Sequence, residues 1–157
     1  MIIGVFAIIK RGPWWLVLRR HQTGFMDGYY SFCAGHVEAG ESPQEAMVRE
    51  LAEEIGVFAR AEDLRLVHTQ SINAEDGPRL HLYFEVTSWE GEPENKEPHK
   101  CDEVRWVEVT QLPINTIPYI QGVIHAVRER AGYSETGWAT TSIAKDVVDR
   151  EAAEYEE

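Results

Sequence analysis

Residues 42–56, SPQEAMVRELAEEIG, constrain the fold more than any other part of the chain. Ser42 and Glu45 have the spacing of a reciprocal capping box, in which each side chain accepts a backbone N–H of the other residue. Pro43 suits the first helical turn, where its missing N–H costs nothing. Gly56 suits the left-handed residue that ends many helices. The pattern therefore predicts a helix that begins after Ser42 and stops at Gly56.

The two faces of this predicted helix differ in chemistry. One face carries an apolar stripe suited to docking on a sheet, made of Met47, Leu51 and Ile55. Another carries Glu50, Glu53 and Glu54 at positions i, i+3 and i+4, with Cβ atoms about 5–6 Å apart. Three like charges this close are unfavourable unless a cation lies among them. A solvated helix face and a site for a hard divalent cation, which prefers oxygen ligands, are the two interpretations.

Apolar and aromatic runs elsewhere predict β-strands, bounded by turns rich in Gly, Pro, Asn and Asp. We expect these strands at residues 2–9, 14–19, 29–33, 64–72, 79–89 and 104–109. A second helix is expected at about residues 119–130. Hairpins mixed with helices predict an α/β (α+β) fold, a sandwich with a mixed sheet between helices. We place one domain at residues 1–131 and an extension with a helical, acidic end at residues 132–157.

The composition limits the partners of the chain. Its 157 residues include 15 Lys+Arg and 27 Asp+Glu, a formal charge of −12. This balance argues against a nucleic acid polymer as partner, because such binding depends on clustered basic residues. It is compatible with a small phosphorylated substrate whose charge a metal neutralises. The first apolar run is too short for a membrane span, so we expect a cytoplasmic protein with no membrane partner. Cys33 and Cys101 form no CxxC motif and are expected to be free thiols.

The glutamate helix is part of a longer spaced motif. Gly35 and Glu41 precede Arg49-Glu50-Leu51-x-Glu53-Glu54-x-Gly56-Val57 at fixed intervals, and this stretch resembles the Nudix box at every fixed position. Residues 88–97 and 112–116 resemble segments of the MutT-like branch of the same family. The resemblance implies a Nudix α/β/α sandwich that hydrolyses nucleoside diphosphates linked to another group, with Mg²⁺ or Mn²⁺ as cofactor.

The resemblance also assigns roles to individual residues. It implies metal ligation by the carbonyl of Ala34 and by Glu50, Glu53, Glu54 and Glu97. The implied catalytic residues are Glu50 and Glu53, with Arg49 orienting the carboxylates, and one of Glu50, Glu53 and Glu54 is expected to be the base for water. Asn115 resembles a base-reading asparagine, with an Asn in a turn as the alternative. Gly35 and Arg19 are further expected substrate-binding residues, and for Arg19 a solvated strand end is the alternative. The implied structural residues are Gly35, Glu41 and Gly56. Cys33-Ala34 depart from the Pro-Gly that many relatives have before the box.

The sequence leaves several alternatives open. We expect cleavage of a nucleoside triphosphate to the monophosphate and pyrophosphate. ADP-ribose, a dinucleoside polyphosphate and another nucleotide conjugate are alternative substrates, and a non-catalytic nucleotide-binding module is the alternative class. His36, His68 and His81 show no paired ligand spacing. Residues 133–138 receive no role from the pattern, and they leave a homodimer contact open.

Overall fold

The computed structural model describes residues 1–138, and the expected C-terminal helix falls outside this part. The described elements, in chain order, are β1 (Ile2–Ile8), β2 (Lys10–Arg11), β3 (Trp14–Arg20), β4 (Tyr30–Ser31), β5 (Cys33–His36), α1 (Pro43–Ile55), the 3₁₀ turn η1 (Ala61–Asp63), β6 (Leu64–Ala74), β7 (Gly77–Val86), β8 (Cys101–Glu108), α2 (Pro118–Arg128) and β9 (Tyr133–Thr136).

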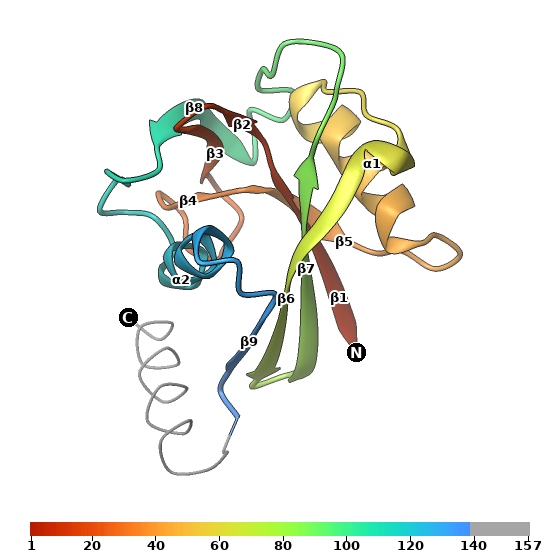
Figure 1. Cartoon of the computed structure of the whole chain (residues 1–157), viewed down its shortest axis with the longest axis vertical. Helices are drawn as coiled ribbons and strands as arrows, with labels where there is room; N and C mark the ends of the chain where they lie inside the picture. The colour runs from red at the N-terminus through yellow and green to blue at the C-terminus, as the bar shows by residue number, and fades with distance from the viewer. Residues whose placement is uncertain (139–157) are drawn as a thin grey trace.

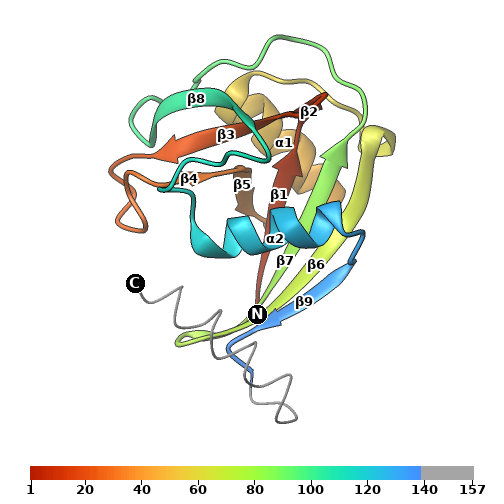
Figure 2. The same cartoon turned by 60° about the vertical axis from the view of Figure 1, so that its left-hand side comes forward.

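A mixed five-stranded sheet forms the centre, in the order β5-β1-β7-β6-β9. The β1–β7 and β6–β9 pairs are parallel, whereas β1–β5 and β6–β7 are antiparallel. A second sheet is built around β3, which pairs with β2, β4 and β8. Helix α1 lies on one side of the central sheet and α2 on the other (Figure 1). Figure 2 shows α2 crossing in front of β1, β7 and β6. The expected α/β/α sandwich is confirmed.

Strand β1 supplies both halves of the core, because successive side chains of a strand point to opposite faces. Val5, Ala7 and Ile9 pack in the cluster that contains the buried residues of α1. Phe6 and Ile8 pack instead in the cluster that contains α2. The near-continuous apolar run at residues 2–9 therefore marks a strand covered on both faces, as a central parallel pair requires.

The predicted caps of α1 are confirmed. The Ser42 hydroxyl accepts the backbone N–H of Glu45 at 3.1 Å, and the Glu45 carboxylate accepts that of Ser42 at 3.3 Å. Pro43 is the first helical residue, and Gly56 ends the helix with φ 65° and ψ 28°. A β-carbon is disfavoured in this left-handed conformation, so glycine is required there.

Replacing Leu51 by Ala should lower the free energy of unfolding by about 2–5 kcal/mol. Leu51 is fully buried between α1 and the sheet, and the vacated volume cannot collapse completely. Leu66→Ala is the matched control, because Leu66 on β6 is 51% exposed and should change stability far less. Chemical denaturation of both variants measures the difference. Equal losses in the two variants would contradict the assignment of Leu51 to the core.

Several strand boundaries differ from the sequence prediction, including the strand expected at residues 79–89, which is Gly77–Val86. The single strand expected at residues 29–33 is two short strands in different sheets, because the chain crosses between the sheets at Phe32. Residues 30–31 pair with β3, and residues 33–36 pair with β1. Strand β8 begins at Cys101, three positions earlier than expected, since its polar first residues pair with the long β3. Pairing partners distant in sequence set these boundaries, not local propensity.

Residues 133–136, which the sequence pattern left without a role, form β9 and extend the central sheet beside β6. His68 on β6 holds this strand with both ring nitrogens. Its Nδ1 lies 2.7 Å from the Ala131 carbonyl, and its Nε2 lies 2.8 Å from the Ser134 hydroxyl. The sheet thus continues past residue 131, where we expected the extension to begin.

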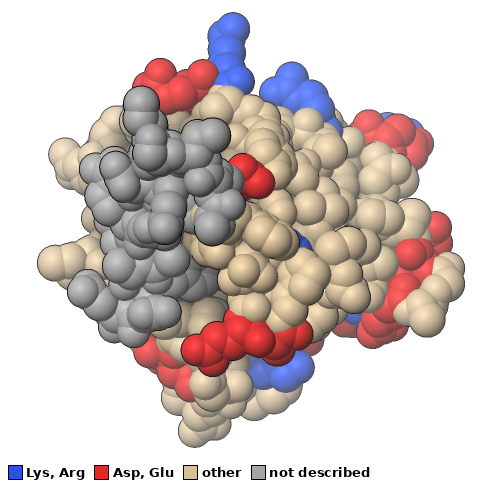
Figure 3. All heavy atoms as spheres, turned by 90° about the horizontal axis from the view of Figure 1, so that it is seen from below, with Lys and Arg blue, Asp and Glu red and all other residues tan. Residues whose placement is uncertain are grey.

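On the face drawn in Figure 3, most of the described surface belongs to uncharged residues, with Asp and Glu side chains scattered over it. Lys and Arg side chains on this face lie separately near the margin and do not gather into a patch. Within residues 1–138, no helix has the length and apolar character needed to cross a lipid bilayer.

Candidate active site

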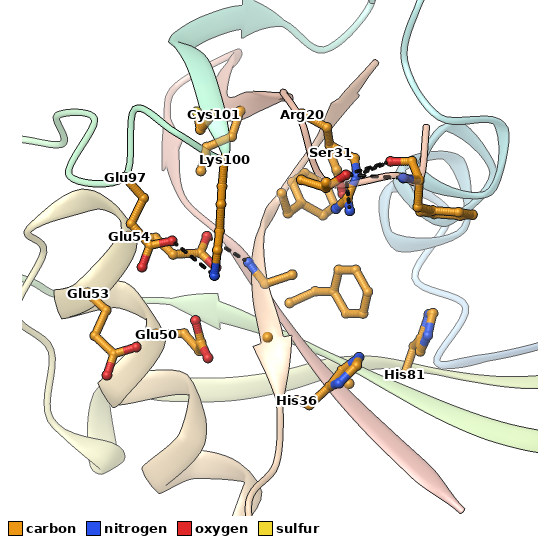
Figure 4. Close-up of a pocket in the computed structure, with 18 of the residues that line it drawn as sticks. Arg20, Ser31, His36, Glu50, Glu53, Glu54, His81, Glu97, Lys100 and Cys101 are labelled. Atoms are coloured by element: carbon orange, nitrogen blue, oxygen red, sulfur yellow. Dashed lines mark hydrogen bonds and ion pairs between the residues drawn. The ribbon is translucent and has the colours of Figure 1, made fainter. Parts of the chain in front are cut away.

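A single large cavity, of about 1030 Å³, joins most of the predicted site residues. Glu50, Glu53 and Glu54 from α1 line one end of it together with Glu97 from the loop before β8. Figure 4 shows these four carboxylates on one side of the pocket, with Lys100 extending toward Glu97 and Glu54. The i, i+3, i+4 spacing thus produces a carboxylate-lined wall, not a solvated helix face.

Arg49 orients the neighbouring carboxylates through several hydrogen bonds. Its guanidinium donates to both oxygens of Glu41, at 2.7 and 3.1 Å, and to Glu50 at 2.7 Å. Weaker contacts reach Glu53 at 3.4 Å and the backbone carbonyl of His36 at 3.1 Å. The hydrogen bonds to Glu41 and then Glu50 raise the pKa of Arg49, which keeps it a permanent cation. Arg49 therefore fixes Glu50 relative to the loop before the helix.

Glu41 anchors that loop, as its position in the motif implies. Its Oε1 accepts the backbone N–H of Glu38 at 2.9 Å while the same carboxylate receives Arg49. The hydrogen bond from Arg49, followed by that from the Glu38 backbone, lowers the pKa of Glu41. A charged Glu41 thus links the glycine loop to the helix that carries the site.

Glu54 is the most unusual carboxyl group of the cavity. Burial, followed by the hydrogen bond and charge of neighbouring Glu50, raises the pKa of Glu54 to about 8. The backbone N–H of Ala34 donates to it at 3.4 Å. A buried carboxylate beside a second carboxylate is costly when ionised, and a nearby cation offsets that cost.

Glu97 reaches the site because the loop between β7 and β8 is tied to the end of α1. The backbone N–H groups of Glu94 and Lys96 donate to the carbonyls of Ile55 and Glu54, each at 3.0 Å. These bonds satisfy two carbonyls that a helix end leaves free. Earlier in the same loop, Glu92 forms a bidentate salt bridge with Arg11 of β2, and both N···O distances are 2.8 Å. The loop is thereby fixed against two elements.

Gly35 on β5 is required by a close approach of α1. A β-carbon at this position would lie 2.1 Å from Cδ and 2.2 Å from Oε1 of Glu50. Ala34 and Gly35 pair with Phe6 and Val5 of β1, so the backbone that faces Glu50 belongs to the central sheet. Because Gly35 has no side chain, the Glu50 carboxylate can pack directly against the backbone of β5.

The donor set fits a hard divalent cation. Four carboxylates line one wall, Glu54 is buried without full charge compensation, and the absence of a side chain at Gly35 lets the Glu50 carboxylate lie against the backbone of β5. Mg²⁺ and Mn²⁺ prefer such oxygen ligands and take additional ones from substrate phosphates. Among residues 1–138, no three or more His, Cys, Asp or Glu side chains are arranged so that they could hold a metal ion, so metal binding requires the glutamate side chains to reorient. Contacts with Arg49 and Ala34 hold Glu50 and Glu54 instead.

The opposite end of the cavity is aromatic, and Phe25 is the one of its residues that the sequence offers as a candidate for stacking a base. Its lining includes Phe6, Phe32, Tyr119 and the half-exposed Phe25. Arg20 stacks over Phe25 at 5.3 Å and donates to the Phe25 backbone carbonyl at 2.6 Å, which fixes the rim. The only sequence signal was the aromatic content of residues 25–32, which core packing explains equally well.

Two predicted substrate residues are engaged by other groups. Arg19 lines the cavity, but its Nε donates to Asp102 at 2.6 Å and Nη1 lies 3.3 Å from Glu103. Asn115 is not among the residues that line the cavity. Its amide donates to the Gly28 carbonyl at 2.8 Å and so supports the loop before β4. The structure thus brings the metal-ligand set together, but it does not place Asn115 with that set.

A sandwich of this topology, with a capped glutamate helix and a glycine strand around one cavity, defines a MutT-like Nudix domain. A sequence model described as the NUDIX domain matches residues 2–127. The chain therefore belongs to the Nudix family, whose members are hydrolases that act on pyrophosphate bonds and typically depend on a divalent metal.

Individual relatives agree with this assignment. The chain is 30% identical over 109 residues to an 8-oxo-dGTP diphosphatase of Escherichia coli K12, covering 65% of this chain and 75% of that protein. It is 31% identical over 109 residues to the NAD-capped RNA hydrolase NudC of Pseudomonas aeruginosa, covering 69% of this chain but 37% of NudC. The chain thus spans little more than a third of that relative. The crystal structure of a MutT Nudix hydrolase from Burkholderia pseudomallei superposes with a TM-score of 0.71 at 21% identity, covering 79% and 95% of the two chains.

Proposed function

We propose that the protein hydrolyses a nucleoside triphosphate to the monophosphate and pyrophosphate with Mg²⁺ or Mn²⁺ as cofactor. The observation that carries this proposal is the two-ended cavity, with four carboxylates at one end and aromatic side chains at the other. A nucleotide has matching ends, since its phosphates require a cation and its base is a flat ring. Two relatives are named for reactions on nucleotides, an 8-oxo-dGTP diphosphatase and a CTP pyrophosphohydrolase.

Different residues of the site have different roles in the proposed reaction. Glu50, Glu53, Glu54 and Glu97, with the Ala34 carbonyl, would hold the metal, which would polarise phosphoryl oxygens and neutralise the leaving pyrophosphate. Glu53 is the most exposed of the three helix carboxylates and has only a 3.4 Å contact with Arg49, so it is free to accept a proton from water. The water oxygen forms a new bond to phosphorus as the bond to the bridging oxygen breaks.

Lys100 supplies a positive charge at the mouth of the metal end. Its side chain is 62% exposed and its ammonium lies 4.0 Å from Glu97, its only ion-pair contact among the described residues. A lysine that is held this weakly can turn toward the outer phosphates of a substrate. Arg19, by contrast, is neutralised by Asp102 and Glu103, so a role in phosphate binding requires it to exchange those partners.

A substrate panel tests the proposal. The protein is incubated with the four common NTPs, oxidised dNTPs, ADP-ribose and dinucleoside polyphosphates, with Mg²⁺, with Mn²⁺ or with EDTA. We expect nucleoside monophosphate and pyrophosphate from at least one triphosphate, lost in EDTA and restored by either metal. Hydrolysis confined to ADP-ribose or dinucleoside polyphosphates would replace the proposed substrate. No hydrolysis of any compound, together with nucleotide binding, would favour a binding module.

A further inference from the structure

His81 on β7 lies in the aromatic part of the cavity and takes no part in the hydrolytic chemistry proposed above. It is only 8% exposed, and it lines the same cavity as the glutamates. Its ring packs against Phe6, with centroids 4.7 Å apart, and near Tyr119 at 5.7 Å. In Figure 4 it stands across the pocket from Glu50, Glu53 and Glu54.

The ring nitrogens of His81 are not satisfied by the protein. Nδ1 is buried and has no hydrogen-bond partner, and it is the one such side-chain atom in residues 1–138. His68, the other buried histidine of the sheet, uses both of its nitrogens within the protein. Buried polar groups are nearly always paired, and exceptions need an explanation. His68 is thus a structural histidine, whereas His81 retains unused hydrogen-bonding capacity.

The chemistry of the ring assigns its proton. Burial, followed by the nearby charges of Arg79 and His36, lowers the pKa of His81 to about 4, so the imidazole is neutral at physiological pH. A neutral imidazole has one N–H donor and one acceptor nitrogen. Nδ1 is fully buried without a partner, whereas Nε2 lies beside the space at Gly4, so we place the proton on Nε2, where a ligand can accept it. His81 is therefore a hydrogen-bond donor through Nε2.

Gly4 keeps the Nε2 edge of the ring uncovered. Gly4 is paired with His81 in the parallel β1–β7 register and lines the same cavity. A β-carbon on Gly4 would lie 3.2 Å from Cδ2 and 3.6 Å from Nε2 of His81. Any larger side chain would occupy the space in front of this edge. The pair thus leaves room for an acceptor atom of a ligand beside the donor.

We propose that His81 determines base specificity by donating a hydrogen bond from Nε2 to a ring carbonyl oxygen of the substrate's nucleobase. This inference rests on the proposed function and deepens it. Phe6, Phe32 and Tyr119 provide flat apolar walls for the ring, and His81 provides the polar contact. Guanine, uracil, thymine and cytosine have a ring carbonyl. Adenine has none, and a base bound in the same orientation as guanine would place its amino group, a donor, opposite the donor of His81. The enzyme therefore favours carbonyl-bearing bases.

Binding and turnover are measured separately in the test. Calorimetry gives Kd for GMP, UMP, CMP and AMP, and steady-state kinetics give kcat/KM for the matching triphosphates with Mg²⁺. For the unaltered protein, we expect at least one carbonyl-bearing nucleotide to exceed the adenine nucleotide by about tenfold or more in both measurements. His81→Leu should remove most of that ratio, mainly through KM, and His81→Asn, which retains a donor, should restore part of it. His125→Leu, an exposed histidine of α2 outside the cavity, is the matched control.

A second variant covers the case in which His81→Leu does not fold. Gly4→Ala retains the imidazole but adds a carbon 3.2 Å from its Cδ2 and 3.6 Å from its Nε2, and it should weaken the same preference. A uniform change for all four bases, or an unchanged ratio in both variants, would overturn the inference. Failure of the unaltered protein to hydrolyse any triphosphate would overturn the proposed function instead, and the monophosphate Kd values would still decide the role of His81.

Discussion

Replacing Glu54 by Gln is expected to lower Mg²⁺-dependent turnover at least about 100-fold, since a catalytic metal contributes several kcal/mol and each 1.36 kcal/mol is tenfold in rate. The amide has nearly the same shape, but it loses the charge that holds a cation beside Glu50. Glu53→Gln should cause a loss of similar size with the fold retained. Glu62→Gln, on the exposed turn η1, is the matched control and should retain full activity. Full Mg²⁺-dependent activity in both Glu53→Gln and Glu54→Gln would contradict the assigned site.

Although Glu54→Gln should lower activity, it should increase the stability of the metal-free protein at neutral pH. The pKa of Glu54 is raised to about 8 in the folded protein. A carboxyl with a raised pKa contributes its stability below the unfolded pKa and loses it as the pH rises through the folded pKa. The metal-free protein should thus lose stability between about pH 5 and pH 8, and Glu54→Gln should lack this component. Denaturant unfolding in EDTA at both pH values measures it. If Glu54→Gln leaves the pH dependence of stability unchanged, Glu54 does not have a raised pKa in the folded protein.

Gly35→Ala should lower turnover by about 100-fold, because a displacement of about 1 Å at a catalytic group can have an effect of that size. The added carbon would lie 2.1 Å from Cδ of Glu50, so that carboxylate has to move away from its 2.7 Å contact with Arg49. The helix itself should persist, since its caps and apolar stripe are untouched. Circular dichroism and steady-state kinetics distinguish a displaced carboxylate from a lost fold.

Gly122→Ala is the control for Gly35→Ala. Gly122 lies within α2, and a β-carbon there would meet nothing within 4 Å. Alanine is a better helix former than glycine, by about 1 kcal/mol, so this control should keep its activity and gain stability. Equal activity in the Gly35 and Gly122 variants would show that the close approach of strand and helix is unimportant for catalysis.

The local parts of the fold were predictable from the sequence. The capping box, the left-handed Gly56 and the stripe of Met47, Leu51 and Ile55 place α1 correctly. These features depend on residues three or four positions apart, and helix geometry fixes such relations. The gathering of Glu50, Glu53 and Glu54 on one face follows from the same geometry. The family resemblance of this stretch is confirmed by the NUDIX domain model, which matches residues 2–127.

The strand boundaries were predicted less well, because they depend on partners far away in the chain. Residues 29–33 look like one strand, yet their backbone groups pair with β3 on one side of Phe32 and with β1 on the other. Residues 133–136 have little strand character of their own. They become β9 because the adjoining β6 presents an open edge and His68 bonds to Ala131 and Ser134.

The sequence by itself determined the helix, its three carboxylates and the glycine that must precede them. Only the tertiary structure decided which groups meet those carboxylates. Glu97 joins them because backbone N–H groups of its loop bind the last carbonyls of α1, and His81 faces the far end of the cavity because β1 and β7 pair in parallel. The physical reason is the range of the interactions. Spacing along one helix is set by bonded geometry, whereas contacts across 40 or 80 residues exist only after the sheets have packed.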